Sequence, residues 1–138
     1  MPLDSNQDIA DLLRNARTIA MVGASDRPDR ASHGVMRFLQ SKGYRVIPVN
    51  PQLAGQSIHG EPVVAALADI AEPIDIVDIF RNSAAAGPVI DDAIAVGAGA
   101  VWTQLGVFND EAVARAEAAG LKAVVNRCPK IEIPRLGL

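Results

Sequence analysis

Five polar or glycine-bearing segments each follow a short apolar run, and the first has the composition of an anion-binding loop. The run from Ile19 to Val22 ends at Gly23-Ala24-Ser25, and a helix is expected to begin near Ser32. Gly23 can adopt a positive φ, Ser25 can donate its hydroxyl, and the first turn of the next helix offers unpaired N–H groups. Together with the helix dipole, these donors predict a phosphate site.

Cationic side chains in the same segment would strengthen such a site. Arg27, Arg30, Ser32 and His33 all lie between the loop and the start of the helix. Because arginine pairs bidentately with phosphate and keeps its charge, Arg30 is a stronger candidate than His33. The alternative is that Arg27 and Arg30 are solvated loop charges beside the two neighbouring aspartates.

The loop departs from the dinucleotide-binding fingerprint. Gly-x-Gly-x-x-Gly would require glycine at positions 25 and 28, where this chain has Ser25 and Pro28. After the second expected strand come Asn50 and Pro51, where nicotinamide-dinucleotide enzymes usually carry an acid for the ribose hydroxyls. An amide can donate to a phosphate or adenine and accept from a ribose, so Asn50 is compatible with either. The alternative is that Asn50 caps the turn at Pro51.

Two further segments could contact an elongated ligand. Phe80 and Arg81 follow the third expected strand and offer a stacking face and a charge to a purine or a phosphate. The alternative is that Phe80 closes the core. Gln104, Leu105 and Gly106 form an uncharged loop whose backbone amides could bind a largely neutral ligand.

The single cysteine, Cys128, follows the fifth expected strand and precedes Pro129. Lone cysteines are most often inert core residues, and the functional alternative is a thiol near the reactive end of a ligand. His33 and His59 are the only histidines, and neither is spaced to activate Cys128. No metal site and no catalytic residue are expected from this set.

Apolar periodicity predicts the elements that position these segments. Strands are expected over 19–22, 45–49, 74–80, 100–103 and 122–125, and helices over 5–15, 32–42, 62–67, 84–96 and 111–119. This alternation predicts an α/β fold, with residues 1–138 as a single three-layer Rossmann-like domain. The parallel sheet of about five strands should have helices on both faces and strand order 3-2-1-4-5. Ligands bind outside the carboxyl ends of such strands, which is where the five segments fall.

Composition limits the class of protein. The 138 residues are 49% hydrophobic and carry a net charge of −3, which argues against a nucleic-acid or membrane-surface partner. One cysteine excludes an intramolecular disulfide framework. The start of the sequence lacks a basic segment followed by an apolar one, and no apolar run reaches the ~18 residues that span a bilayer. A cytoplasmic protein is therefore expected.

Taken together, the motifs resemble small stand-alone CoA-binding proteins with a Rossmann-like fold, which are related to the CoA-binding domain of the succinyl-CoA synthetase alpha subunit. The likeness covers about residues 9–136, and its most specific part is the Tyr44 to Pro51 block. The matching segments are Val22-Gly23-Ala24-Ser25 with Pro28 beyond, Gly43 to Pro51, Asp78-Ile79-Phe80-Arg81, Val101 to Gly106, and Asn126-Arg127-Cys128-Pro129.

The resemblance implies that coenzyme A lies along the carboxyl edge of the sheet. Its phosphates would meet the Gly23 loop and the next helix, its nucleotide would meet Asn50 and Phe80, and its pantetheine arm would meet the Gln104 loop. A thiol near the end of that arm could form a mixed disulfide with CoA. The candidate cofactor-binding residues are Gly23, Ala24, Ser25, Arg30, Ser32, His33, Asn50, Pro51, Phe80, Arg81, Gln104, Leu105, Gly106 and Cys128.

The synthetase alpha subunit has a second domain carrying the histidine that is phosphorylated, and this chain ends before any such domain. Ligase activity is therefore not expected, and the expected role is a non-catalytic carrier, sensor or accessory module for CoA or an acyl-CoA. Two alternatives are a small NAD(P)-binding oxidoreductase and a CoA-linked protein of thiol redox protection. A protein partner or a homo-oligomer is compatible with the sequence.

Overall fold

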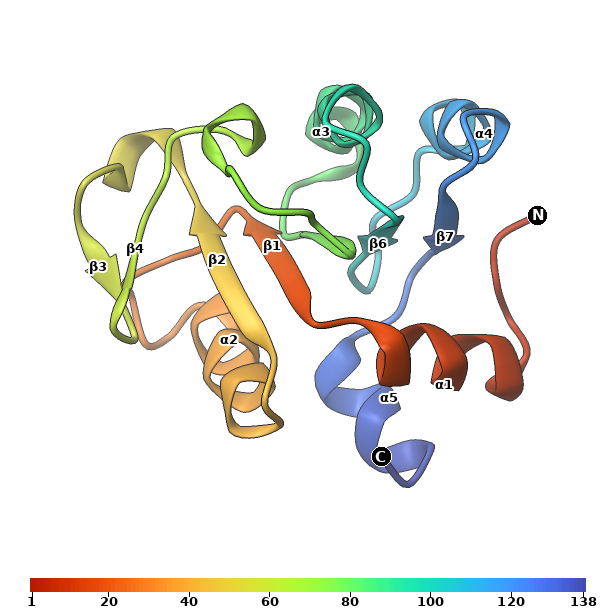
Figure 1. The fold of residues 1–138 in the computed structure, drawn as a ribbon, viewed down its shortest axis with the longest axis horizontal. Coiled ribbons are helices and arrows are strands. Elements are labelled where there is room, and N and C mark those ends of the chain that lie inside the picture. The colour runs from red at the N-terminus through yellow and green to blue at the C-terminus, as the bar shows by residue number, and fades with distance from the viewer.

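A five-stranded parallel sheet forms the centre of the computed structural model, which describes residues 1–138 (Figure 1). Its strands are β1 (Thr18–Val22), β2 (Arg45–Val49), β5 (Ile76–Ile79), β6 (Ala100–Thr103) and β7 (Lys122–Val124). Nearly every strand residue is buried, because both faces of the sheet are covered. The α/β fold class predicted from the sequence is confirmed.

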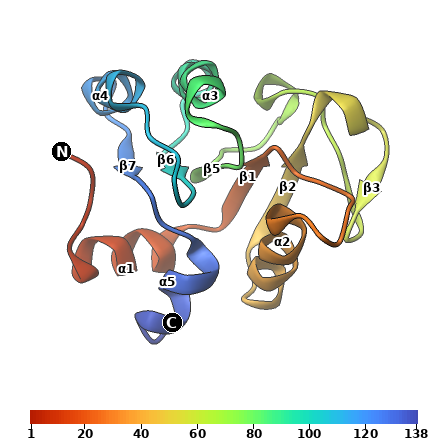
Figure 2. The ribbon, with the colours of Figure 1, turned by 180° about the vertical axis from the view of Figure 1, so that it is seen from behind.

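Helices cover the two faces of the sheet as separate layers (Figures 1 and 2). One layer holds α1 (Asn6–Asn15), α2 (Ala31–Ser41) and α5 (Pro129–Arg135), and the other holds α3 (Ser83–Ala95) and α4 (Asp110–Ala118). Each layer packs its own cluster of buried side chains against the sheet, and Trp102 lies in the first. None of the helices is long and apolar enough to cross a membrane.

The strand order differs from the expected one. Numbering only the five long strands, the observed order is 2-1-3-4-5 rather than 3-2-1-4-5, because β5 pairs with the free side of β1. The outer edge of β2 is instead occupied by Val64, which forms a parallel bridge with Val49. The connection from β1 to β2 runs through α2 on one face of the sheet. The connection from β2 to β5 runs back across the sheet, and because such connections are right-handed it must cross the other face. Leu67 and Ile74 pack on that opposite face beside α3.

The connection from β2 to β5 also holds a short hairpin in place of the expected helix from Pro62. Pro62 lies in β4 (Glu61–Pro62), which pairs with β3 (Ser57–Ile58), and only a 3-10 turn follows at Leu67–Asp69. The expected helix was wrong because Val63 N and Val64 N bond to Gln56 O and Pro48 O, so the backbone there is extended.

The sequence does not predict α5, because its seven residues include Pro129 and Pro134. The helix is held by Glu132, a buried carboxylate that accepts hydrogen bonds from Arg135 (2.8 Å) and Arg127 (2.8 Å). These bonds, that from Arg135 foremost, hold the pKa of Glu132 below its ordinary value. The ion pairs of Glu132 and the burial of Ile133 thus stabilise a helix that local propensity disfavours.

Asp78 is a buried carboxyl group without a partner. It lies in β5 between Met21 of β1 and Trp102 of β6, and it is fully buried. Neither of its side-chain oxygens has a hydrogen-bond partner. Loss of solvation raises the pKa of Asp78 well above its ordinary value, so the neutral acid is favoured over the carboxylate.

This burial predicts a pH-dependent stability. In the unfolded chain Asp78 loses its proton above about pH 4, whereas the folded chain keeps that proton to higher pH. Stability should therefore fall as the pH rises above about 4, with a slope of at most about 1.4 kcal/mol per pH unit. In Asp78→Asn this dependence should vanish, because the amide does not titrate. In urea denaturation, the unfolding free energy of the variant relative to that of the wild type should therefore increase as the pH rises. A difference in unfolding free energy that stays the same at every pH would contradict the conclusion that burial raises the pKa of Asp78.

Candidate functional site

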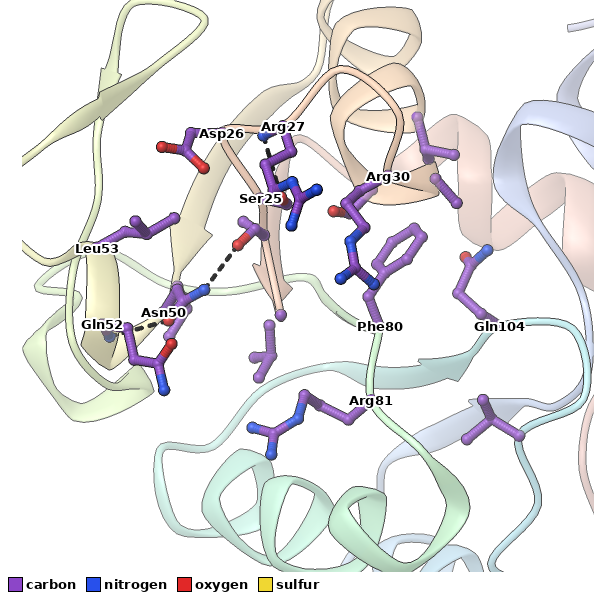
Figure 3. A pocket seen from close by; sticks show the side chains of 18 of the residues that line it. Ser25, Asp26, Arg27, Arg30, Asn50, Gln52, Leu53, Phe80, Arg81 and Gln104 are labelled. Atoms are coloured by element: carbon purple, nitrogen blue, oxygen red, sulfur yellow. Dashed lines mark hydrogen bonds between the residues drawn. The ribbon is translucent and has the colours of Figure 1, made fainter.

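The carboxyl ends of four strands meet at one open cavity of about 900 Å³ (Figure 3). Its walls are the loops after β1, β2, β5 and β6, the first turns of α2, and Cys128 at the start of α5. A volume of this size falls in the range of small-molecule sites in proteins. The cavity lies where the sequence predicts a site, at the carboxyl edge of the sheet.

Gly23 shapes the floor of the cavity by its close contact with the end of β5. Its φ is +89°, and a Cβ added there would lie 2.3 Å from the carbonyl oxygen of Phe80. Gly23 N also donates to Val49 O at 3.0 Å, which ties the loop to β2. The turn continues through Ser25, whose Oγ accepts from Arg27 N at 3.1 Å. Only glycine satisfies both the backbone conformation and the contact.

Asn50 joins the loop after β1 to the turn after β2. Its Nδ2 donates to Ala24 O at 2.9 Å, and its Oδ1 accepts from Gln52 N at 2.9 Å, as the dashed lines in Figure 3 show. Asn50 is the N-cap of the 3-10 turn Pro51–Leu53, so the capping role considered from the sequence is confirmed. An aspartate there would lose the donor to Ala24 and set a carboxylate against a carbonyl oxygen.

Charged side chains gather at the exposed end of the cavity. Arg27, Arg30 and Arg81 are all solvent-exposed, and Asp26 lies among them. Arg27 approaches Asp29 at 3.6 Å, whereas Arg30 and Arg81 form no salt bridge. In Figure 3, Arg30 from the start of α2 lies beside the Phe80 ring, and Arg81 follows Phe80 in the loop after β5. Two unpaired guanidinium groups thus face the same opening.

The opposite end of the cavity is buried and nearly uncharged. Val35 from α2 is 4% exposed, and Gln104 and Cys128 are each 8% exposed. The Oε1 atom of Gln104 is buried and has no hydrogen-bond partner, and in Figure 3 the amide stands beside the Phe80 ring. An acceptor without a donor in such a place is costly unless a ligand or water supplies the hydrogen.

Hydrogen bonds fix this buried end by joining the loops after β6 and β7. Asn126 N donates to Thr103 Oγ1 at 3.1 Å, and Arg127 N donates to Thr103 O at 3.2 Å. The Asn126 side chain in turn accepts from Gly106 N at 2.7 Å. Cys128 directly follows Arg127, and Gln104 directly follows Thr103. These two residues are therefore held on adjacent backbone segments.

All of the candidate residues except His33 and Gly106 line the cavity. His33 follows Ser32 on the helix and faces away from the cavity, where its ring lies 4.1 Å from that of His59. The carbonyl oxygen of His33 lies 2.9 Å from His59 Nε2. Gly106 uses its N–H to bind Asn126. Neither residue adds to the cavity wall.

Sequence reasoning missed several lining residues. The lining residues outside the candidate set are Val22, Asp26, Arg27, Ala31, Val35, Val49, Gln52, Leu53 and Val107. Val35 lies one helical turn after Ser32, so the spacing of the helix could have found it. Gln52 and Leu53 belong to a 3-10 turn in a segment without apolar periodicity, which gave no signal.

Comparison with known proteins gives consistent matches over most of the chain. A family model described as CoA binding domain matches residues 17–134. The uncharacterized protein YneT of Bacillus subtilis (strain 168) is 37% identical over 127 residues, which are 92% of this chain and 93% of YneT. The structure of cell-free ID.343 from Thermus thermophilus is 39% identical with a TM-score of 0.92, covering 96% of this chain and 99% of that one.

A more distant match belongs to a larger enzyme. The dinucleotide forming acetyl-coenzyme A synthetase 1 of Ca. Korarchaeum cryptofilum, in complex with phosphate and ADP, is 26% identical with a TM-score of 0.68. The match covers 82% of this chain and 26% of the synthetase. The fold of this chain therefore corresponds to about a quarter of that enzyme.

The contact at Gly23 predicts a large loss of stability in Gly23→Ala. The matched control is Gly55→Ala, because Gly55 has a φ of +87° and no atom within 4 Å of an added Cβ. The control should lose about 1 to 2 kcal/mol of unfolding free energy from its backbone conformation alone. Gly23→Ala should lose about 1 to 3 kcal/mol more, because the added methyl meets the Phe80 carbonyl. Equal losses in urea denaturation would show that the contact is unimportant.

Proposed function

The chain belongs to the CoA binding domain family, and we propose that it binds coenzyme A, free or acylated, in the cavity at the carboxyl edge of its sheet. The observation that carries this proposal is that the charge and the solvent exposure of the lining side chains change along the cavity. Arginines surround the exposed end, and nearly uncharged, buried side chains surround the other. Coenzyme A has the same polarity, with phosphates at one end and a neutral pantetheine thiol at the other.

The start of α2 supports placing phosphate at the exposed end. Helices α1, α3 and α4 are each capped by a side chain, from Ser5, Asn82 and Asn109, whereas α2 and the seven-residue α5 are not. Helix α2 begins at the cavity without a side-chain cap, and its N-cap residue is Arg30. The unpaired N–H groups, the helix dipole and the guanidinium together favour an anion. We assign the CoA phosphates to this end, with Arg81 as a second cationic contact.

The unpartnered oxygen of Gln104 supports placing pantetheine at the buried end. A buried acceptor without a donor costs about 1 to 3 kcal/mol. The pantetheine arm carries amide N–H groups, and one of these would supply the missing donor to Gln104 Oε1. Leu105, which is 57% exposed at the rim, would cover the arm with an apolar side chain.

We further propose that the protein acts as a binding module, a carrier or sensor of CoA or acyl-CoA. The titratable side chains of the lining are Asp26, Arg27, Arg30, Arg81 and Cys128. General acid–base catalysis typically uses a group such as histidine or a carboxylate near the reacting atoms, and the buried end presents neither. The lining therefore supports recognition of a ligand more than its chemical conversion.

Native mass spectrometry of the purified protein, followed by calorimetric titration, tests the ligand. A co-purifying CoA species, or tight binding of added CoA with far weaker binding of NAD, is expected. The reason is that Asn50 occupies the place where a nicotinamide-dinucleotide site usually has an acid. Tight binding of NAD with no binding of CoA would overturn the proposal.

Arg30→Ala should weaken CoA binding about tenfold at low salt, because one charge-assisted contact to phosphate is lost. It should also reduce the dependence of affinity on salt concentration, as measured by calorimetry at several salt concentrations. The matched control is Arg37→Ala, an exposed arginine on the same helix that does not line the cavity. Its affinity and salt dependence should equal those of the wild type. Loss of affinity in both variants alike would point to general charge rather than to a contact.

A further inference from the structure

We propose that Cys128 and the thiol of bound coenzyme A join in a mixed disulfide when a peroxide is present. This inference rests on the proposed function, because the CoA thiol reaches Cys128 only if the pantetheine arm occupies the buried end. Cys128 is the single cysteine of the chain, so no disulfide within the chain competes for it.

The placement of Cys128 and Gln104 on neighbouring backbone segments carries the inference. Both residues are 8% exposed, and both line the cavity. The hydrogen bond from Arg127 N to Thr103 O holds their backbone segments side by side. Gln104 Oε1 independently indicates a ligand there, because it is buried and lacks a donor. A pantetheine amide that donates to Gln104 would bring the end of the arm toward the Cys128 thiol.

The wall around Cys128 limits which thiol can react with it. Val35, Phe80 and Gln104 also line the cavity, and Ser32 is buried beside Val35 on the same helix. A thiol delivered by a bound arm would have a high effective concentration, whereas a thiol in bulk solution must enter the cavity by chance. Hydrogen peroxide is small enough to enter through the opening.

The reaction balances as a two-electron oxidation of two thiols by one peroxide. One thiol sulfur first attacks a peroxide oxygen, the O–O bond breaks, and a sulfenic acid and one water form. The second sulfur then attacks the sulfenic sulfur, and the S–O bond breaks. The oxygen leaves as a second water that carries the proton of the attacking thiol. The product is the Cys128–CoA disulfide, and a reductant restores both thiols.

Intact-mass measurement without reductant tests the inference on the native protein. The protein is incubated with reduced CoA or with 2-mercaptoethanol at matched concentrations, with hydrogen peroxide added, and is then quenched in acid. The expected result is one CoA adduct per chain that a reductant removes. It should form at a concentration at least tenfold lower than the 2-mercaptoethanol adduct. Arg30→Ala should weaken the preference for CoA, because the nucleotide is held less tightly.

A relocated thiol is the matched control. In the double variant Cys128→Ser with Ser41→Cys, the single cysteine lies on the exposed end of α2, away from the cavity. This variant should form both adducts with no preference for CoA. Calorimetry with reduced CoA separates the two proposals. If CoA binds but forms no adduct, or shows no preference over 2-mercaptoethanol, the disulfide inference is wrong and the proposed function stands. Absence of CoA binding would overturn both.

Discussion

The close contact between Gly23 and the carbonyl oxygen of Phe80 is the constraint on which the cavity depends. Because residue 23 has no side chain, the loop after β1 can lie directly against the end of β5. The positive φ of Gly23 is a backbone conformation that residues other than glycine rarely adopt. The chain then turns over the sheet edge and enters α2 with the helix N-terminus facing the cavity. The side chain of Asn50 donates a hydrogen bond to Ala24 O and so joins the same loop to the turn after β2. The cavity is thus shaped by close backbone packing at Gly23 together with one side-chain hydrogen bond from Asn50.

The sequence predicts most of the fold because buried parallel strands appear as short apolar runs between capped amphipathic helices. Ser5 and Asn109 cap α1 and α4, and the sequence predicts both helices at nearly the observed positions. The strand order was not predictable from these runs. It is defined by the pairing of β5 with β1, and the edge of β2 carries instead the bridge from Val64, within a segment that has no periodicity of its own. Helix α5 escaped prediction for a related reason, since the bonds of Glu132 to two arginines outweigh two prolines.

The candidate site was predictable as an edge of the sheet but not as a set of contacts. Residues placed directly after strands, such as Gly23, Phe80 and Gln104, line the cavity as topology requires. His33 does not, because a single step along a helix turns a side chain to another face. The partners of Asn50 could not be foreseen either. Ala24 lies 26 residues away in sequence, and only the register of β1 against β2 brings the two together.

The pairing of Val64 with Val49 has a consequence for how copies of this chain can associate. An open strand edge is a template for pairing with another molecule, and proteins commonly cover such edges. The bridge occupies the carboxyl end of the β2 margin, and at the far margin Leu3 N donates to Ala123 O of β7 at 2.8 Å. Both margins are therefore engaged within the chain. A neighbouring molecule that paired with these parts of the two margins would have to displace one of the two segments.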